Sequence, residues 1–260
     1  MIGIGIAGPG LDGWAAARAI LAGTIEYRPT PLTPPIPQLL SSAERRRCSQ
    51  SARLAIAAAQ DALLAGHLQG ESIATVFTSS DGDGAITQEI CESLAGAARD
   101  ISPTSFHNSV YNAPAGYWSI ATRSQLSSTS VCAYDVSFAA GLLEAAAYTT
   151  VERCPVMLVA LDLPFPRPLY GIRPVEESFA VALLITPARH PDARMRCEIT
   201  LAPHQTITAF PAAIPESLRS NPAARSLPLL SVLARQAADT VRLEYTDESD
   251  LVVSCEPEGD

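Results

Sequence analysis

Pro-Val-Met-Leu-Val-Ala-Leu at residues 155–161 and Phe-Ala-Val-Ala-Leu-Leu-Ile at residues 179–185 are the stretches that decide the fold class. Both are continuous apolar runs of strand length, which is typical of strands buried on both faces of a sheet. An earlier strand-like run occupies residues 73–77, and an alanine-rich helical segment, residues 136–149, separates it from these two. Strands that alternate with a helix and are covered on both faces predict a layered α/β fold.

The N-terminal segment predicts a strand, a glycine turn and a helix. Residues 1–10 are strand-like and end in glycine and proline, and residues 14–22 form an apolar helical pattern. Gly3, Gly5 and Gly8 have the spacing G-x-G-x-x-G, but a dinucleotide fingerprint needs a strand before its first glycine. Only two residues precede Gly3. The pattern therefore favours a plain strand and turn over a nucleotide site.

Other segments extend this alternation along the chain. Ser42 is a suitable N-cap for a helix over residues 42–65, and a polar glycine loop at residues 78–84 precedes a second helical segment. We expect the remaining helices at residues 85–98 and 228–241, and a further strand at residues 251–255.

The composition indicates a compact globular protein. Of 260 residues, 47% are apolar and 17% are charged, so the chain can bury enough surface to offset its ordering entropy. The net charge of −9 argues against nucleic acid and anionic membrane surfaces as partners. No apolar run approaches the roughly 18 to 20 residues of a membrane span, and the first cation is Arg18. We expect a cytoplasmic protein.

The cations and cysteines exclude several kinds of chemistry. All eighteen cations are arginine, so neither a Schiff-base lysine nor a P-loop lysine is present. The six cysteines are widely spaced, form no Cys-x-x-Cys pair and have no histidine in ligand register. The sequence therefore predicts no metal and no cofactor, and buried free thiols at Cys48, Cys91, Cys132, Cys154, Cys197 and Cys255.

The middle of the chain resembles a known family. Ile-Ser-Pro at residues 101–103 is followed at residues 106–116 by Phe-His-Asn-Ser-Val-Tyr-Asn-Ala-Pro-Ala-Gly. This pattern resembles the segment that β-ketoacyl synthases carry ahead of their nucleophile, with Asn112 and Gly116 at the family's spacing. The resemblance covers residues 1 to about 200. It implies a thiolase-like fold, the N-terminal half of a ketosynthase, with α-β-α layers and a mixed sheet.

The same resemblance implies a division of the chain. Residues 1–203 would form the ketosynthase-like N-terminal domain. Residues 204–260, which resemble no part of the family, would form a C-terminal extension packed on the same domain.

The position of the family's nucleophilic cysteine can be assigned in two registers. Counting forward without gaps from the Ile-Ser-Pro segment places Asp135 there, and this register keeps the small residues Ala145 and Ala146 aligned in the following helix. A gap of three places Cys132 there instead, within a Val-Cys-Ala sequence that resembles the family's. We prefer Asp135, a carboxylate that cannot form the thioester that condensation requires. The alternative structural roles are a helix N-cap for Asp135 and a buried strand thiol for Cys132.

The histidines give a second argument against condensation. Ketosynthases use two histidines from a C-terminal half that this chain is too short to contain. None of His67, His107, His190 and His204 lies in the family's sequence contexts, and the family's lysine is absent. The resemblance thus implies a chain length factor, an inactive ketosynthase relative of polyketide, aryl polyene or fatty-acid-like systems. Its partner would be a full-length β-ketoacyl–acyl carrier protein synthase in a heterodimer, with acyl carrier protein contacted indirectly.

Positions taken from the family give the expected partner surface and tunnel wall. These positions are Ser80, Gly82, Ser105, Ser109, Tyr111, Asn112, Tyr134 and Phe138. For the three aromatic residues an ordinary core position is an equal alternative. The rival function is an enzyme, a cysteine acyltransferase or thioesterase that uses Cys132 with His107 as its base.

Overall fold

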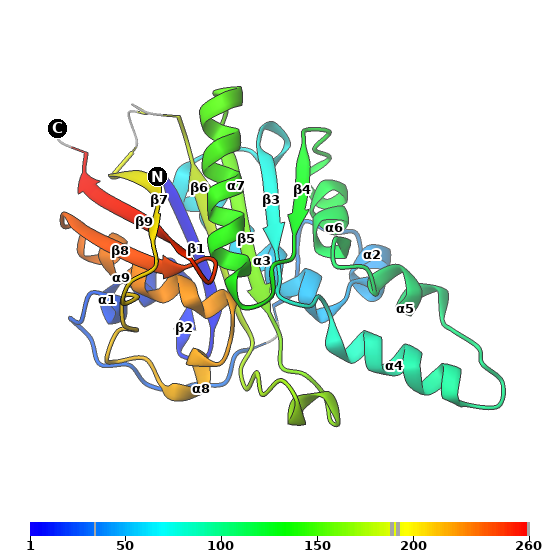
Figure 1. Cartoon of the computed structure of the whole chain (residues 1–260). Helices are drawn as coiled ribbons and strands as arrows, with labels where there is room; N and C mark the ends of the chain where they lie inside the picture. Colours follow the sequence, from blue (N-terminus) through cyan, green and yellow to red (C-terminus); the bar gives the residue numbers. More distant parts are fainter. Residues whose placement is uncertain (34, 188–189, 191–192, 259–260) are drawn as a thin grey trace.

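The computed structural model describes residues 1–33, 35–187, 190 and 193–258. Its centre is a six-stranded mixed sheet in the order β2-β1-β6-β5-β3-β4, with helices on both faces (Figure 1). The strands of this sheet are β1 (Gly3–Gly8), β2 (Leu11–Asp12), β3 (Ala74–Thr78), β4 (Ser128–Val131), β5 (Val156–Asp162) and β6 (Phe179–Ile185). The layered α/β fold with a mixed sheet is confirmed.

The strand directions determine where the chain can build a site. β3 pairs in parallel with both β4 and β5, whereas β6 is antiparallel to β5 and to β1. The carboxyl ends of β1, β3, β4 and β5 therefore lie at one edge of the sheet. In β5 and β6, predicted from the two apolar runs, every residue but Ile185 is buried.

One face of the sheet is covered by α3 (Gln50–Gly66) and α6 (Ala113–Thr122). The N-terminal glycines explain how closely α3 approaches. A Cβ atom on Gly3 would lie 2.2 Å from the carbonyl oxygen of Ala62, and one on Gly5 would lie 1.9 Å from that of Ala58. The first two glycines of the G-x-G-x-x-G pattern thus let a helix pack against β1.

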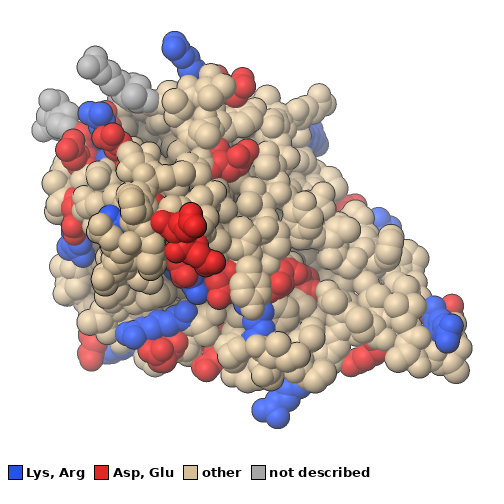
Figure 2. Space-filling view, in the orientation of Figure 1, with Lys and Arg blue, Asp and Glu red and all other residues tan. Residues whose placement is uncertain are grey.

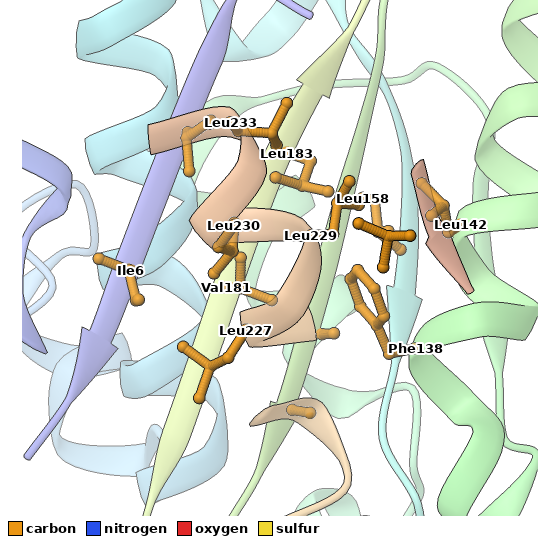
Figure 3. Packing of buried hydrophobic residues seen from close by; sticks show 14 of the residues in the cluster. Ile6, Phe138, Leu142, Leu158, Val181, Leu183, Leu227, Leu229, Leu230 and Leu233 are labelled. Carbon is orange, nitrogen blue, oxygen red and sulfur yellow. The ribbon is translucent and has the colours of Figure 1, made fainter. Parts of the chain in front are cut away.

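The opposite face is covered by α1 (Trp14–Leu21), α7 (Ser137–Glu152) and α9 (Leu227–Arg235). Figure 3 shows Leu229 and Leu230 of α9 lying over Val181 of β6, with Phe138 and Leu142 of α7 beside them. Isoleucines of β1 alternate with its glycines, so its large side chains face this second core.

A smaller antiparallel sheet in the order β7-β9-β8 completes this layer, beside both termini in Figure 1. Its strands are β7 (Met195–Pro203), β8 (Asp239–Glu244) and β9 (Ser249–Pro257). Val241, Leu251 and Val253 of this sheet belong to the same hydrophobic cluster as α9 and α7. Residues 204–258 therefore contribute side chains to the core that the large sheet shares.

Two predicted helices differ from the structure. The segment at residues 42–65 is two helices, α2 (Ser42–Arg47) and α3, because Cys48 is extended and Ser49 accepts from Ala52 N to cap α3. Ser41 rather than Ser42 caps α2.

The segment predicted as a helix at residues 228–241 also ends early. α9 stops at Arg235, and Gln236 follows in a left-handed conformation with φ 52°. The alternating residues after it then form β8, whose Val241 and Leu243 point into the core.

The last helices lie at the periphery. They are α4 (Gly84–Ala95), α5 (Pro103–Asn108) and α8 (Glu216–Arg219). α4 and α5 form an arm that projects from the body of the molecule (Figure 1), and only Gly84 of α4 is buried.

Candidate functional site

Three polar segments meet at the carboxyl edge of the parallel strands. Ser79 and Ser80 follow β3, Cys132 follows β4, and Asp162 ends β5. This is the edge at which α/β folds place ligands and reactive groups. Asn221 joins it from the C-terminal part of the chain, because its side-chain amide donates to the carbonyl oxygen of Asp162 at 3.0 Å.

The turn between β4 and α7 is held in one conformation. Tyr134 has a φ of +52°, which is rare for a residue with a Cβ. Ser137 accepts from the backbone N–H of Ala133 at 2.9 Å, and its hydroxyl lies 2.7 Å from the carbonyl oxygen of Tyr134. The hydroxyl thus bridges both sides of the residue in the rare conformation, and this projects Tyr134 outward.

Asp135 is bound by two arginines and does not cap the helix. Its carboxylate accepts from Arg173 at 2.7 Å and from Arg225 at 3.2 Å, whereas the N-cap residue of α7 is Val136. The N-cap role for Asp135 is therefore wrong. Arg173 also lies 2.6 Å from Asp81 through Nε, an ion pair without the geometry of a hydrogen bond.

The same arginine supports the exposed aromatic ring of the turn. The guanidinium carbon of Arg173 lies 3.8 Å from the centroid of the Tyr134 ring. Hydrogen bonding and the charges of Asp135 and Asp81 raise the pKa of Arg173 against the opposing effect of its burial. The charged guanidinium group of Arg173 therefore holds the Tyr134 ring in place through a cation–π contact.

Cys132 is exposed and lies after β4, so the buried strand thiol is wrong. Its Sγ donates to the carbonyl oxygen of Ser80 at 2.8 Å. Partial burial of the sulfur raises the pKa of Cys132 above its usual value, and the carboxylates of Asp81 and Asp162 act in the same direction. An activated nucleophilic thiol requires the opposite shift.

His107, the base of the enzyme alternative, lies on α5. Its ring makes an edge-to-face contact with Tyr117, with the centroids 5.8 Å apart. The hydrogen bond of the Cys132 thiol goes to the backbone of Ser80. The structure therefore places the two residues of this alternative in separate contacts.

Asp162 is the most perturbed carboxyl group of this edge. It is buried, and its Oδ1 accepts from Ser79 Oγ at 3.0 Å and from both the N–H and the hydroxyl of Ser80 at 2.8 Å. Oδ2 is buried with no hydrogen-bond partner among the described residues. Burial raises the pKa of Asp162 to about 6, although the serine hydrogen bonds oppose it.

Sequence reasoning missed Asp162, Arg173 and Arg225. The available signal for Asp162 is a carboxylate that directly follows the apolar run at residues 155–161. The two arginines gave no signal, because they reach Asp135 from 38 and 90 residues away.

Of the predicted partner and tunnel residues, Tyr111, Asn112 and Tyr134 are exposed. Tyr111 and Tyr134 expose 51% and 58% of their surface, which leaves large side chains free to contact another molecule. Gly82 lies in the loop after β3 and has a φ of +76°. A Cβ atom on Gly82 would lie 3.5 Å from the Cα of Tyr111, so this loop packs against the segment that follows α5.

The other predicted residues are buried or half-buried. Ser80 and Phe138 are buried, and Phe138 belongs to the core against α9. Ser105 is also buried and donates to Glu89 at 2.6 Å, which joins α5 to α4. Ser109 is half-buried and donates to the carbonyl oxygen of Phe106 at 2.8 Å.

The cysteines differ from their predicted burial. Cys48 and Cys255 are buried and Cys154 and Cys197 half-buried, but Cys91 and Cys132 are exposed. All six are free thiols. Among the described residues no group of three histidine, cysteine, aspartate or glutamate side chains could hold a metal ion.

Figure 2 shows the surface distribution of charge on one face. Arginines and carboxylates are intermixed over the body, whereas the surface over the α4–α5 arm is mostly uncharged. Within the described ranges, no helix has the length and apolar character needed to cross a bilayer.

Known proteins with this architecture were found by sequence and by structure. Residues 20–246 match the family described as β-ketoacyl synthase, N-terminal domain. No curated protein sequence matches the chain. The family match extends to residue 246, so residues 204–246 lie within the matched region.

Three solved complexes contain a chain similar to this one over nearly its whole length. A chain of the ketosynthase ApeO in complex with its chain length factor ApeC, from Xenorhabdus doucetiae, is 25% identical with a TM-score of 0.71, and the match covers 96% of both chains. A chain of the ishigamide ketosynthase/chain length factor is 13% identical with a TM-score of 0.76, covering 100% of this chain and 99% of that one.

The third is a chain of AntDE:AntF, a type II polyketide synthase acyl carrier protein with its ketosynthase, at 12% identity and a TM-score of 0.72. The match covers 98% of this chain and 97% of that chain. The architecture is thus thiolase-like, as the resemblance implied. Because the family match spans most of its length, the chain belongs to the β-ketoacyl synthase N-terminal domain family.

Proposed function

We propose that this chain is a chain length factor-like subunit without catalytic activity of its own. It pairs with a complete β-ketoacyl–acyl carrier protein synthase and shapes the acyl tunnel of that partner in polyketide, aryl polyene or fatty-acid-like biosynthesis. Acyl carrier protein is engaged through the ketosynthase. Similarity to chains of ketosynthase–chain length factor complexes supports this proposal.

The observation that carries the pairing is an apolar surface at the carboxyl edge. Phe106, Val110 and Tyr111 expose 50% or more of their surface on or just after α5, and Tyr134 and Ile172 expose 58% and 86%. The surface over the arm carries little charge (Figure 2). Exposed aromatic side chains of this kind supply the central contacts of protein interfaces.

The absence of catalysis rests on the turn between β4 and α7. In one register the nucleophile position holds Asp135, whose carboxylate is already bound by Arg173 and Arg225. In the other it holds Cys132, whose thiol has a raised pKa and donates to a backbone carbonyl. Neither Asp135 nor Cys132 therefore supplies the reactive thiolate that accepts an acyl group in a ketosynthase.

The pairing is tested by co-expression with a complete β-ketoacyl–acyl carrier protein synthase from the same organism. We expect a heterodimer on size exclusion, and we expect Tyr134→Ala and Tyr111→Ala to weaken it about tenfold or more, as loss of a buried aromatic contact does. Leu64→Ala is the control, since Leu64 is 76% exposed on α3 near the opposite edge of the sheet. No complex with the unaltered chain, or equal weakening by all three variants, would contradict the proposal.

Catalysis is tested by intact-protein mass spectrometry after incubation with acyl-loaded carrier protein. We expect acylation of the ketosynthase alone, and no adduct on this chain with or without its partner. An adduct that Cys132→Ser removes would identify the chain as a cysteine acyltransferase instead.

Tunnel shaping has its own readout. When Tyr134 or Tyr111 is replaced by alanine at protein concentrations that maintain the complex, we expect the partner to release longer products. Unchanged product lengths would remove tunnel shaping from the proposal while leaving pairing intact.

A further inference from the structure

Two thiols face each other across the small sheet. Cys197 on β7 and Cys255 on β9 are directly opposite in the antiparallel ladder, and their sulfur atoms lie 3.3 Å apart. Opposite residues in such a ladder have Cα atoms about 4.5 to 5.5 Å apart. A disulfide accepts Cα separations of about 4.4 to 6.8 Å. The pairing of the two strands therefore places the Cα atoms of Cys197 and Cys255 at a separation that a disulfide bond accepts.

One thiol of the pair is accessible and the other is protected. Cys197 is half-buried and lines a groove of about 1020 Å³ between α7 and β7, together with Leu142 and Ala146. Cys255 exposes only 1% of its surface behind it. A small molecule that enters the groove can reach Cys197 first.

The surroundings favour ionisation of the accessible thiol. The hydrogen bond with Cys255 lowers the pKa of Cys197 against the opposing effect of burial. The same hydrogen bond and burial raise the pKa of Cys255.

We propose that Cys197 and Cys255 form a reversible disulfide when the protein meets a peroxide. The Cys197 thiolate attacks one peroxide oxygen, the O–O bond breaks, hydroxide leaves, and Cys197 becomes a sulfenic acid. The Cys255 sulfur then attacks the Cys197 sulfur, the S–O bond breaks, and water leaves with the Cys255 proton. Two thiols are oxidised by two electrons and one peroxide is reduced; a dithiol reductant reverses the reaction.

The bond would close a loop of the chain that contains much of the second core. Cys197 and Cys255 are 58 positions apart, and the segment between them includes α8, α9 and β8. No other hydrogen bond between thiols occurs among the described residues, so Cys91 and Cys132 have no resolving partner. The inference concerns this sheet and does not depend on the proposed pairing.

The test is made on the purified full chain with hydrogen peroxide. We expect a mass loss of about 2 Da, a non-reduced peptide that joins Cys197 to Cys255, and full reversal by dithiothreitol. Oxidation should raise the melting temperature by roughly 5 to 15 °C, because the cross-link constrains the unfolded chain. Cys91→Ser is the matched control and should behave like the unaltered chain.

Cys197→Ser and Cys255→Ser each replace one atom of a side chain and should abolish both the cross-linked peptide and the temperature shift. The proposal is overturned if Cys197 and Cys255 are still fully alkylated under denaturing conditions after a peroxide dose that has consumed Cys91. That measurement uses the unaltered chain and needs no variant to fold.

Discussion

At the residue scale, the carboxyl edge contains two aspartates with opposite environments. Asp135 is partly exposed and satisfied by two guanidinium groups, whereas Asp162 is buried and satisfied on one oxygen only. The first stabilises a turn through charge pairing, and the second holds Ser79 and Ser80 at the cost of burying a charge. Their substitutions should therefore have different signatures.

For Asp135→Asn we expect a loss of about 1 to 2 kcal/mol of unfolding free energy, measured by urea denaturation. The change removes the anion between Arg173 and Arg225, and Arg173 is only 14% exposed, so its charge stays largely desolvated. Asp239→Asn is the control, because it breaks an exposed pair with Arg235 that should contribute less than about 0.5 kcal/mol. Equal losses would show that the Asp135 pairs contribute no more than a surface pair.

For Asp162 we expect a pH signature. Its pKa is raised from an ordinary value of 3.8 to about 6, so its contribution to stability is fully present below pH 3.8 and is lost as the pH rises through 6. The loss is on the order of 3 kcal/mol. Asp162→Asn carries no titrating group, so its stability should improve relative to the unaltered chain between pH 4 and 7.5. A stability difference that is constant over this range in urea titrations would contradict the shift.

At the element scale, periodicity and apolar runs predicted the strands whose residues are buried in the core. β5 and β6 were visible because nearly every residue in them is buried, and their runs of valine, leucine and alanine leave no other interpretation. β4, β7 and β8 were not predicted, since β4 is four residues long and polar, and β7 and β8 lie at the edges of a small sheet. Only Met195 of the nine residues of β7 and two of the six residues of β8 are buried, so these strands carry little hydrophobic signal.

The candidate site was predictable in the same partial way. Cys132 and Asp135 lie in the turn between β4 and α7. The groups that bind these residues could not be read from sequence, because Arg173, Arg225 and Asn221 reach the edge only through the topology of the sheet.

The packing of α3 on β1 gives a prediction for an element. Gly5→Ala would place a Cβ 1.9 Å from the carbonyl oxygen of Ala58, and only a backbone shift can relieve that contact. We expect a loss of about 3 kcal/mol or more in chemical denaturation. Gly116→Ala on the exposed side of α6 has nothing within 4 Å and should be neutral or stabilising by up to about 1 kcal/mol. Similar behaviour of the two variants would contradict the close approach of α3.

At the scale of the whole molecule, the C-terminal segment and the large sheet share one core. All but the last residue of α9 are buried, and Leu229 and Leu230 lie over β6 (Figure 3). We propose that residues 204–260 are a part of the same folding unit as residues 1–203. The segment has its own helices and strands but no separate cluster of buried residues among those described.

A chain truncated after residue 203 should therefore lose cooperative folding. We expect it to bind a hydrophobic dye and to lose its near-ultraviolet circular dichroism, because truncation exposes the apolar face of the sheet that α9 covers. The full chain should unfold in a single transition by both fluorescence and circular dichroism. A truncated chain with a native-like near-ultraviolet spectrum would show that the segment is an independent addition.

The position of β4 at the rim of the six-stranded sheet has a further consequence. Its inner side pairs with β3, and no strand of the described chain pairs with its outer side. Amide protons on that outer side of residues 128–131 should therefore exchange with deuterated water far faster than those of β5, which is flanked by strands on both sides. Because backbone N–H groups alternate between the two sides of a strand, two of these four residues report, without any side-chain change, whether another chain has come to lie along this edge.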